Sequence, residues 1–174
     1  MSRVIGFGDL LVHLSPPGYQ RLMQADHFDV NYTGAEANTL VSLALFGVDT
    51  QFVTRLPDNL VTDCALNNLR RYRVGVDHVV LGGDRIGVYY LEKGASQRPS
   101  RLVYDRKFTS LATTQPGDLD WERIFEGATH FHFTGITPAL GPQLPAICQE
   151  ACQAAHRHRM LVSCDLNYRS ALWN

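Results

Sequence analysis

The sequence lacks long apolar runs, runs of like charge, internal repeats and low-complexity segments. A membrane-spanning helix needs about 18 or more continuous apolar residues, and the short apolar run near the N-terminus has no signal-peptide cleavage pattern. Seventeen acidic residues against sixteen basic ones create no field that would attract a polyanion. We therefore expect a cytoplasmic protein with no nucleic-acid partner and no membrane partner.

Cysteine is scarce, and its spacing does not suggest zinc. The four cysteines are Cys64, Cys148, Cys152 and Cys164, and no pair has the Cys-x-x-Cys spacing of a zinc knuckle. Cys148 and Cys152 lie four residues apart in a segment with helical periodicity, as small buried hydrophobic residues often do. We interpret all four as reduced structural thiols.

Two His-x-His pairs are the remaining candidates for a metal site. His130 and His132 would share one face of a strand, and His156 and His158 lie near the end of a predicted helix. Neither pair has a carboxylate or thiol close by to complete a set of ligands. The sequence therefore predicts no metal site.

What the chain does have is a hydrophobic content of 45% with 19% charged residues, enough for one globular domain spanning residues 1–174. Its periodicity alternates between strand and helix, which predicts an α/β fold with a three-layer, mostly parallel sheet. Strands are predicted at residues 3–8, 50–56, 78–81, 130–136 and 159–165. Helices are predicted at 35–46, from a cap at Asp58 to 73, at 121–125 and at 142–158.

One segment interrupts this alternation. Residues 87–91 and 102–106 resemble two aromatic strands, and a polar turn rich in Gly, Ser and Pro joins them with no helix between. We interpret the insertion, at about residues 87–107, as a small β-sheet lid.

Polar residues follow the predicted parallel strands where each strand ends. Asp9 follows the first strand, Gly135 and Thr137 follow the fourth, and Asn167 and Arg169 follow the last. Each alone is equally typical of a turn, a helix cap or a surface ion pair. Together they favour a ligand site, because parallel sheets bind ligands at the carboxyl ends of their strands.

The stretch YTGAEAN, residues 32–38, opens a predicted helix. Gly34 would let a ligand approach the backbone, the first-turn N–H groups are free to bind ligand oxygens, and the Asn38 amide can both donate and accept. A plain helix start, with Glu36 favourable to the helix dipole, explains the same residues. A dinucleotide site at GFGDLL is disfavoured, because Leu11 stands where the third glycine of G-x-G-x-x-G is required.

Five stretches occur in a characteristic order: GFGDLLVHL, GAEANTLVSLALFGVDTQFVTRL, GVYYLE with RLVYDRK, FHFTGITPAL and CDLNYRSALW. Together they resemble the N-terminal half of ribokinase-like (PfkB) sugar kinases, and within that family 2-keto-3-deoxygluconate kinases. The resemblance covers essentially all residues. Members of the family are about twice as long, so it implies that this chain has the N-terminal half only and that the C-terminal half is absent.

The resemblance implies transfer of the ATP γ-phosphate to the 6-hydroxyl of 2-keto-3-deoxygluconate, with Mg²⁺, in a homo-oligomer formed through the lid. In the family the general base and the Gly-Ala-Gly-Asp anion hole belong to the C-terminal half, so no catalytic residue is expected in this chain and the chain alone is expected to be inactive. A non-catalytic sugar-acid-binding module and a fructokinase-like kinase remain alternatives.

The resemblance also implies which residues bind ligands. The substrate-binding residues are expected to be Asp9, Gly34, Ala35, Glu36, Ala37, Asn38, Tyr89, Tyr104, Asp105, Arg106 and Arg169, and the nucleotide-binding residues Asn167, Tyr168 and Arg169. Two positions depart from the family pattern. Thr33 stands where many relatives have a glycine, and it is expected to narrow the space through which a ligand approaches the backbone. Asp105 is expected to place a negative charge beside a site for an anion.

Overall fold

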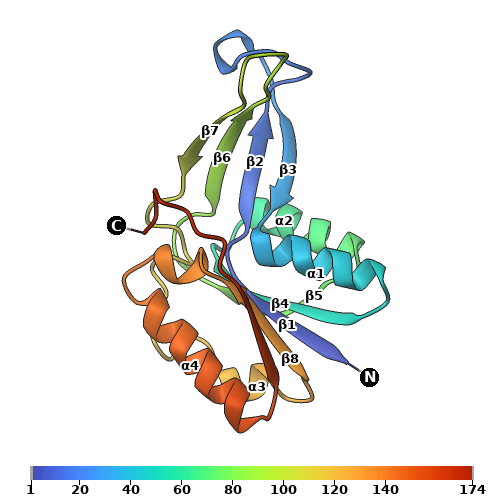
Figure 1. Cartoon of the computed structure of the whole chain (residues 1–174), viewed down its shortest axis with the longest axis vertical. Helices are drawn as coiled ribbons and strands as arrows, with labels where there is room; N and C mark the ends of the chain where they lie inside the picture. The colour runs from blue at the N-terminus through green and yellow to red at the C-terminus, as the bar shows by residue number, and fades with distance from the viewer. Residues whose placement is uncertain (1, 174) are drawn as a thin grey trace.

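The main domain is built on a parallel sheet. The computed structural model describes residues 2–173 (Figure 1). Five parallel strands form the sheet, in the order β5 (Gly75–Leu81), β4 (Asp49–Leu56), β1 (Arg3–Phe7), β8 (His130–Thr134) and β9 (Leu161–Asp165). The predicted α/β class with a mostly parallel sheet is confirmed.

Helices cover both faces of this sheet, which gives the predicted three layers (Figure 1). One face carries α1 (Ala35–Leu45) and α2 (Leu60–Arg71); the other carries α3 (Trp121–Ile124) and α4 (Leu144–Arg157). Strand β1 contributes side chains to the hydrophobic cores on both faces of the sheet, because successive side chains of a strand point to opposite faces. Val4 packs with the α1/α2 side, and Ile5 and Phe7 pack with the α3/α4 side.

A second sheet of four strands projects from the main domain (Figure 1). Its order is β3 (Asp29–Thr33), β2 (Leu11–Ser15), β6 (Gly87–Glu92) and β7 (Arg101–Asp105). We refer to these four strands as the lid sheet. The predicted β6 and β7 are present, but β2 and β3 were not predicted. The lid is therefore not one insertion, since half of it comes from the connection between β1 and α1.

Most predicted boundaries hold to within a few residues, with two corrections. Helix α2 is capped by Asn59 rather than Asp58: the Asn59 side chain accepts hydrogen bonds from the backbone N–H groups of Val61 at 3.0 Å and Thr62 at 3.1 Å. Strand β5 begins at Gly75 rather than residue 78, because residues 75–77 also belong to the strand. Two short 3₁₀ turns, η1 (Leu22–Gln24) and η2 (Thr137–Ala139), complete the elements.

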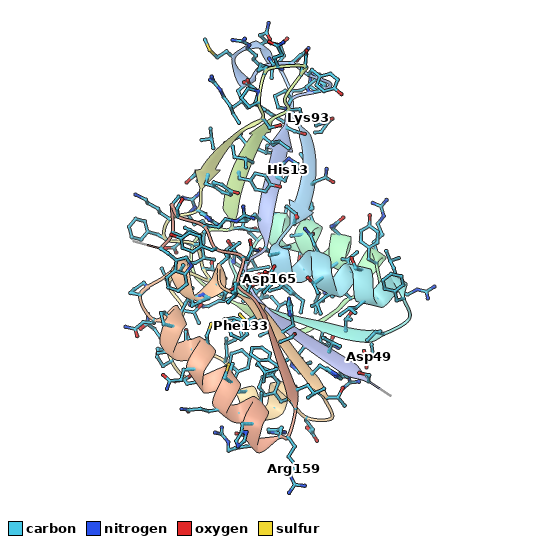
Figure 2. The ribbon with its side chains drawn as sticks, in the orientation of Figure 1. His13, Asp49, Lys93, Phe133, Arg159 and Asp165 are labelled. Carbon is cyan, nitrogen blue, oxygen red and sulfur yellow. The ribbon has the colours of Figure 1, made fainter. Side chains whose placement is uncertain are left out.

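The topology places one point of the sheet in a special position. From the central β1 the chain goes first to β4 and β5 on one side, and later to β8 and β9 on the other. In open α/β sheets a crevice forms at such a switch point, at the carboxyl ends of the strands. The lid sheet rises from this end, as Figure 2 shows with His13 and Lys93 on the lid and Asp165 at the junction below.

Candidate functional site

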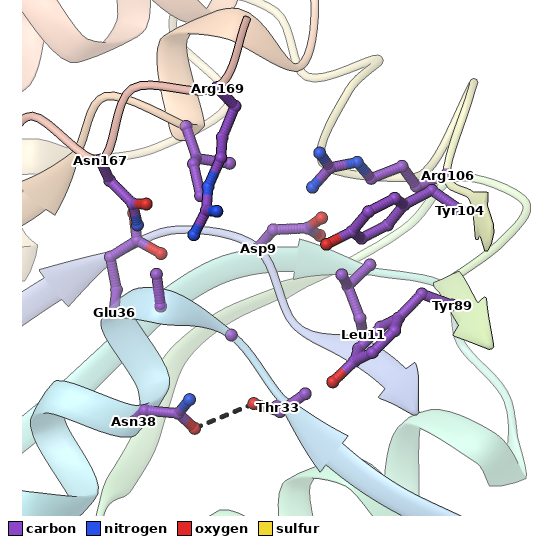
Figure 3. A pocket seen from close by; sticks show the side chains of 13 residues that line it. Asp9, Leu11, Thr33, Glu36, Asn38, Tyr89, Tyr104, Arg106, Asn167 and Arg169 are labelled. Atoms are coloured by element: carbon purple, nitrogen blue, oxygen red, sulfur yellow. Dashed lines mark hydrogen bonds between the residues drawn. The ribbon is translucent and has the colours of Figure 1, made fainter. Parts of the chain in front are cut away.

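A cavity of about 220 Å³ lies where the carboxyl ends of the strands meet α1 and the lid sheet (Figure 3). Pockets for drug-sized ligands have about 300–1,000 Å³, so this one suits a smaller molecule of monosaccharide size. The residues that line it are Asp9, Leu11, Thr33, Gly34, Ala35, Glu36, Asn38, Tyr89, Tyr104, Arg106, Ile136, Asn167 and Arg169.

The cavity brings together ten of the thirteen predicted site residues and leaves out Ala37, Asp105 and Tyr168. Ala37 is 1% exposed and packs in the core on the α1/α2 side. Tyr168 is 69% exposed. Asp105 makes an ion pair with Arg85 at 2.8 Å, so its charge is directed away from the cavity and partly compensated. The expected negative charge beside an anion site is therefore absent from the lining.

Three lining residues were not among the predicted site residues. Leu11 begins β2, a strand that the sequence did not reveal, and Thr33 ends β3, the other missed strand. Ile136 lies between Gly135 and Thr137, which were already recognised as strand-end residues. Thr33 directly precedes Gly34, and Ile136 lies between two strand-end residues, so the sequence points to both; Leu11 depends on recognising a lid strand.

Gly34 allows the start of α1 to lie directly against the segment after β1. A side-chain Cβ at this position would collide with the main-chain oxygen of Asp9. The backbone of Gly34 is extended, with φ −167°, so the requirement is for space and not for unusual torsion angles. The close approach brings the first turn of α1, with its free N–H groups, to the cavity wall beside Asp9.

Glu36 is a structural anchor of the site. It is 1% exposed, and its Oε1 accepts hydrogen bonds from the Thr134 backbone N–H at 3.0 Å and from the Thr137 hydroxyl at 2.7 Å. A Cβ on Gly8 would collide with the Glu36 carboxylate, so the glycine provides the room for it. Glu36 thus ties α1 to β8 and η2, which the sequence interpretation as a dipole-favourable residue did not foresee.

Thr33 orients the Asn38 side chain. The Thr33 hydroxyl donates a hydrogen bond to Asn38 Oδ1 at 3.0 Å, as the dashed line in Figure 3 shows. With its oxygen engaged, the amide presents its NH₂ group as the available hydrogen-bonding group. The threonine that replaces a frequent glycine therefore fixes the direction of a neighbouring polar group as well as narrowing the approach.

Asp9 is a buried carboxylate that faces the cavity. It is 6% exposed, and its Oδ2 has no hydrogen-bond partner within residues 2–173. Burial raises its pKa from 3.8 to about 6; the Glu36 charge raises it as well, while the Arg106 charge and a backbone hydrogen bond from Leu10 lower it. Burying an oxygen without a partner is costly, so the site favours a ligand that donates hydrogen bonds to Asp9.

Another part of the lining is cationic and aromatic. The Arg106 guanidinium lies 4.4 Å from the centre of the Tyr104 ring, and the Tyr89 and Tyr104 ring centres are 5.5 Å apart. Arg106 and Arg169 make no ion pair with any of residues 2–173. Two guanidinium groups without a carboxylate partner can bind an anionic group of a ligand in bidentate fashion.

Asn167 and Arg169 reach the cavity by a turn. The predicted strand delivers alternating polar residues, but β9 ends at Asp165. The Asp165 carboxylate accepts a hydrogen bond from the Asn167 backbone N–H at 3.0 Å, and Asn167 has a positive φ of 36°. Asparagine tolerates this left-handed region better than most residues, which explains its place in the turn.

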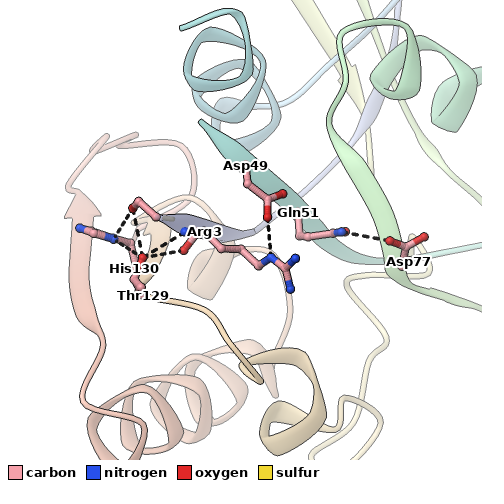
Figure 4. Close-up of polar contacts among 7 residues, drawn as sticks. Arg3, Asp49, Gln51, Asp77, Thr129 and His130 are labelled. Atoms are coloured by element: carbon pink, nitrogen blue, oxygen red, sulfur yellow. Dashed lines mark hydrogen bonds and ion pairs between the residues drawn. The ribbon is translucent and has the colours of Figure 1, made fainter. Parts of the chain in front are cut away.

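The amino-terminal edge of the same sheet has a different character (Figure 4). There Arg3 pairs with Asp49 at 2.7 Å, and His130 Nδ1 lies 2.8 Å from the Thr129 hydroxyl. These polar groups are paired with one another, so this edge has a structural role.

Among residues 2–173 no group of three His, Cys, Asp or Glu side chains could hold a metal ion. No helix in that range is long and apolar enough to cross a membrane.

We predict that Asp9→Asn changes the pH dependence of stability. Since the folded-state pKa of Asp9 is raised, its contribution is most favourable below about pH 4 and is lost as the pH rises through about 6. At roughly 1.4 kcal/mol per pKa unit, the free energy of unfolding of the variant should improve relative to wild type by about 2 kcal/mol between pH 4 and pH 8. Urea denaturation at both pH values measures this, and a parallel dependence in the two proteins would contradict it.

Comparison with solved structures identifies close structural relatives. The 2-dehydro-3-deoxygluconokinase of Thermotoga maritima superposes with a TM-score of 0.97 at 49% sequence identity, covering 99% of this chain and 53% of that one. A protein described as a putative 2-keto-3-deoxygluconate kinase from Enterococcus faecalis has a TM-score of 0.95 at 27% identity, covering 100% of this chain and 52% of that one.

Comparison with curated sequences agrees. The 2-dehydro-3-deoxygalactonokinase of Haloferax volcanii is 34% identical over 175 residues, which cover 99% of this chain and 54% of that protein. The chain thus spans about half the length of the relatives that it matches. The family described as "pfkB family carbohydrate kinase" matches residues 1–174. This protein belongs to the pfkB family of carbohydrate kinases.

Proposed function

We propose that this chain forms the sugar-acid-binding half of a kinase that phosphorylates 2-keto-3-deoxygluconate at its 6-hydroxyl. The observation that carries the proposal is the set of charged groups in one small cavity. Asp9 lines it together with Arg106 and Arg169, and the two arginines also line an adjoining hollow that does not include Asp9. A sugar acid has matching groups, since hydroxyl groups occupy most of its length and a carboxylate occupies one end.

Asp9 and Asn38 are suited to the hydroxyl groups. The unpaired Oδ2 of Asp9 can accept a hydrogen bond from a ligand hydroxyl, and the Asn38 NH₂, held in place by Thr33, can donate one to a hydroxyl oxygen. Gly34 also lines the cavity, and its missing side chain makes room for the Asp9 main-chain oxygen against the start of α1. Hydrogen bonds of this kind compensate the cost of keeping Asp9 buried, which a purely apolar ligand could not do.

Arg106 and Arg169 are suited to the carboxylate. The cationic side continues into an adjoining hollow of about 380 Å³, where Lys107 joins both arginines in the lining. Fructose has no carboxylate to meet these charges, so the site should favour a sugar acid over a neutral sugar. This is the feature that argues against the fructokinase-like alternative.

Phosphoryl transfer needs more than the acceptor site. ATP, when bound, supplies the γ-phosphoryl group, and the family resemblance assigns Asn167, Tyr168 and Arg169 to the nucleotide side. Asn167 and Arg169 reach the cavity, whereas Tyr168 is exposed, so the first two fit that role better. The family implies Mg²⁺, and within residues 2–173 no three His, Cys, Asp or Glu side chains are grouped so that they could hold a metal ion. In this proposal the chain binds and orients the acceptor.

Two alternatives are experimentally separable. The Haloferax volcanii relative is named for 2-dehydro-3-deoxygalactonate, so the galactonate epimer is a competing substrate. A sugar-acid-binding module without catalysis is the other alternative. The binding experiments below distinguish the epimers, and the turnover experiments distinguish a module from a kinase half.

We predict that the protein binds 2-keto-3-deoxygluconate more tightly than fructose. A charged hydrogen bond is worth roughly 1.5–3 kcal/mol, so the ratio of dissociation constants should be about 10-fold or greater. Isothermal titration calorimetry with both sugars and with the galactonate epimer measures the ratios. Arg106→Gln should remove most of the preference, whereas Arg101→Gln, at the start of β7 and outside the cavity lining, should leave it unchanged. Equal affinities for the acid and for fructose in the wild type would refute the proposal.

We predict that the isolated 174-residue chain does not phosphorylate the sugar acid above background, because positioning and charge stabilisation of the phosphoryl group need groups that the family places elsewhere. A coupled assay for ADP formation tests this. Fusing the chain to the part of the Thermotoga maritima enzyme that lies beyond the matched region should then produce activity. Robust turnover by the pure chain would contradict the half-enzyme interpretation, and an inactive but folded fusion would favour the binding module.

We propose that the protein associates through the lid sheet. Leu91 and Leu102 are paired across β6 and β7, and Leu102 is 52% exposed. They lie on the same side of the lid as Tyr89 and Tyr104, since side chains alternate along strands. A second surface competes with this one: all of β9 is exposed at the sheet edge, with Leu161 67% exposed. Exposed strand edges of this kind also promote association.

Light scattering of two variants separates the surfaces. Leu102→Glu should convert the protein to monomers if the lid mediates a symmetric dimer, because burying a charge in that interface is costly. Leu161→Lys, which changes only the β9 edge, should leave the lid-mediated dimer intact. Dissociation by Leu161→Lys alone, or a monodisperse wild-type monomer at micromolar concentration, would contradict lid-mediated association.

A further inference from the structure

A row of stacked groups runs along the lid sheet into the cavity. His13 and Tyr89 are stacked, with ring centres 4.5 Å apart and planes 3° from parallel. Tyr89 is 5.5 Å from Tyr104, and the Arg106 guanidinium lies 4.4 Å from the Tyr104 ring centre. We call these four side chains the stacking row. Its members come from β2, β6, β7 and the residue after β7, so it crosses the lid sheet.

His13 is the one member that does not line the cavity. The strand register explains the contact, because His13 is the cross-strand partner of Tyr89 between β2 and β6. The remaining three members form the aromatic and cationic side of the cavity. His13 therefore lies behind the site, in contact with the ring that begins its wall.

The hydrogen bonding of His13 shows which part of its side chain is used. Its Nε2 is buried and has no hydrogen-bond partner within residues 2–173. Burial, and to a smaller extent the charge of Lys93, lower the pKa of His13, which favours the neutral ring. A neutral imidazole stacks on tyrosine without adding a second positive charge near Lys93. His13 contacts Tyr89 through the face of its ring. Stacking therefore explains the position of the His13 side chain better than hydrogen bonding does.

We propose that His13 is a positioning residue for the ligand site: by stacking on Tyr89 it holds Tyr89 and Tyr104, and through them the Arg106 guanidinium, in the orientation that faces the ligand. The inference rests on the proposed function for the identity of the ligand, but the geometry it concerns exists in the free protein. Each contact in the stacking row restricts the next side chain, so loss of the His13 ring should change the position of the Arg106 guanidinium.

The free protein offers a readout at Asp9. The Arg106 charge lowers the pKa of Asp9, so displacement of Arg106 should raise that pKa above its value of about 6. Carbon-detected NMR of the Asp9 carboxyl group, titrated without ligand, measures this. In His13→Ala the Asp9 pKa should rise, and in His13→Phe, which keeps a stacked ring, it should match the wild type.

Ligand binding provides the second readout. Because an aromatic pair contributes modestly, His13→Ala should weaken 2-keto-3-deoxygluconate binding about 2- to 10-fold in calorimetry, and His13→Phe should restore it. If no variant and not even the wild type binds the sugar acid, the proposed function fails, while the Asp9 titration still decides the role of His13. The two proposals can therefore fail separately.

Two further variants guard against a general loss of lid structure. Leu14→Ala shortens the next side chain of β2, which points to the opposite side of the lid sheet, and should leave the Asp9 pKa unchanged. His13→Leu keeps a bulky side chain without a ring and should behave as His13→Ala. If circular dichroism shows that His13→Ala is unfolded, the comparison of His13→Leu with His13→Phe still tests the proposal. The proposal is overturned if His13→Leu matches His13→Phe, or if the His13 variants leave both readouts unchanged.

Discussion

The hydrogen bonds of the buried Glu36 carboxylate hold the site together. A single oxygen accepts hydrogen bonds from the Thr134 backbone at the end of β8 and from the Thr137 hydroxyl in η2, while Glu36 itself belongs to the first turn of α1. The start of α1 is thereby fixed to a β8–η2 segment that lies about a hundred residues away in sequence. The glycine at position 8 is the condition for this contact, because any side chain there would occupy the place of the carboxylate.

The same anchor has an electrostatic consequence for the cavity. Glu36 lies close enough to Asp9 for its negative charge to raise the pKa of Asp9, in the same direction as burial, and Arg106 acts in the opposite direction. Asp9 is thus a carboxylate whose ionised form is incompletely stabilised by the protein. A ligand that donates hydrogen bonds to Asp9 and presents an anion to Arg106 and Arg169 would stabilise all three groups together. Structural rigidity and ligand preference therefore depend on one network.

The sequence predicted the main domain well because its signals are local. Alternating apolar patterns and a helix stop at Gly47, which has a positive φ of 84°, define the βα units without reference to distant residues. The position of the site followed from the rule for parallel sheets, and ten predicted residues reach the cavity. Asp105 illustrates the limit: its neighbours Tyr104 and Arg106 line the cavity, and only the strand alternation and the partner Arg85 show that its carboxylate is directed elsewhere.

The lid was harder to predict because its strands are short and pair across long distances. Strand β2 lies parallel to β6, a partner more than seventy residues away. The Pro-Pro-Gly turn signal at residues 16–18 follows β2, but the connection to β3 spans residues 16–28, which is much longer than a short hairpin loop. This pairing places Leu11 and Thr33 in the lining and His13 behind Tyr89. The lid sheet and the main sheet are thus joined twice, through the segment after β1 and through the segment after β5. A ligand in the cavity contacts both sheets, so its binding free energy would depend on how rigidly the lid side chains are held before it arrives.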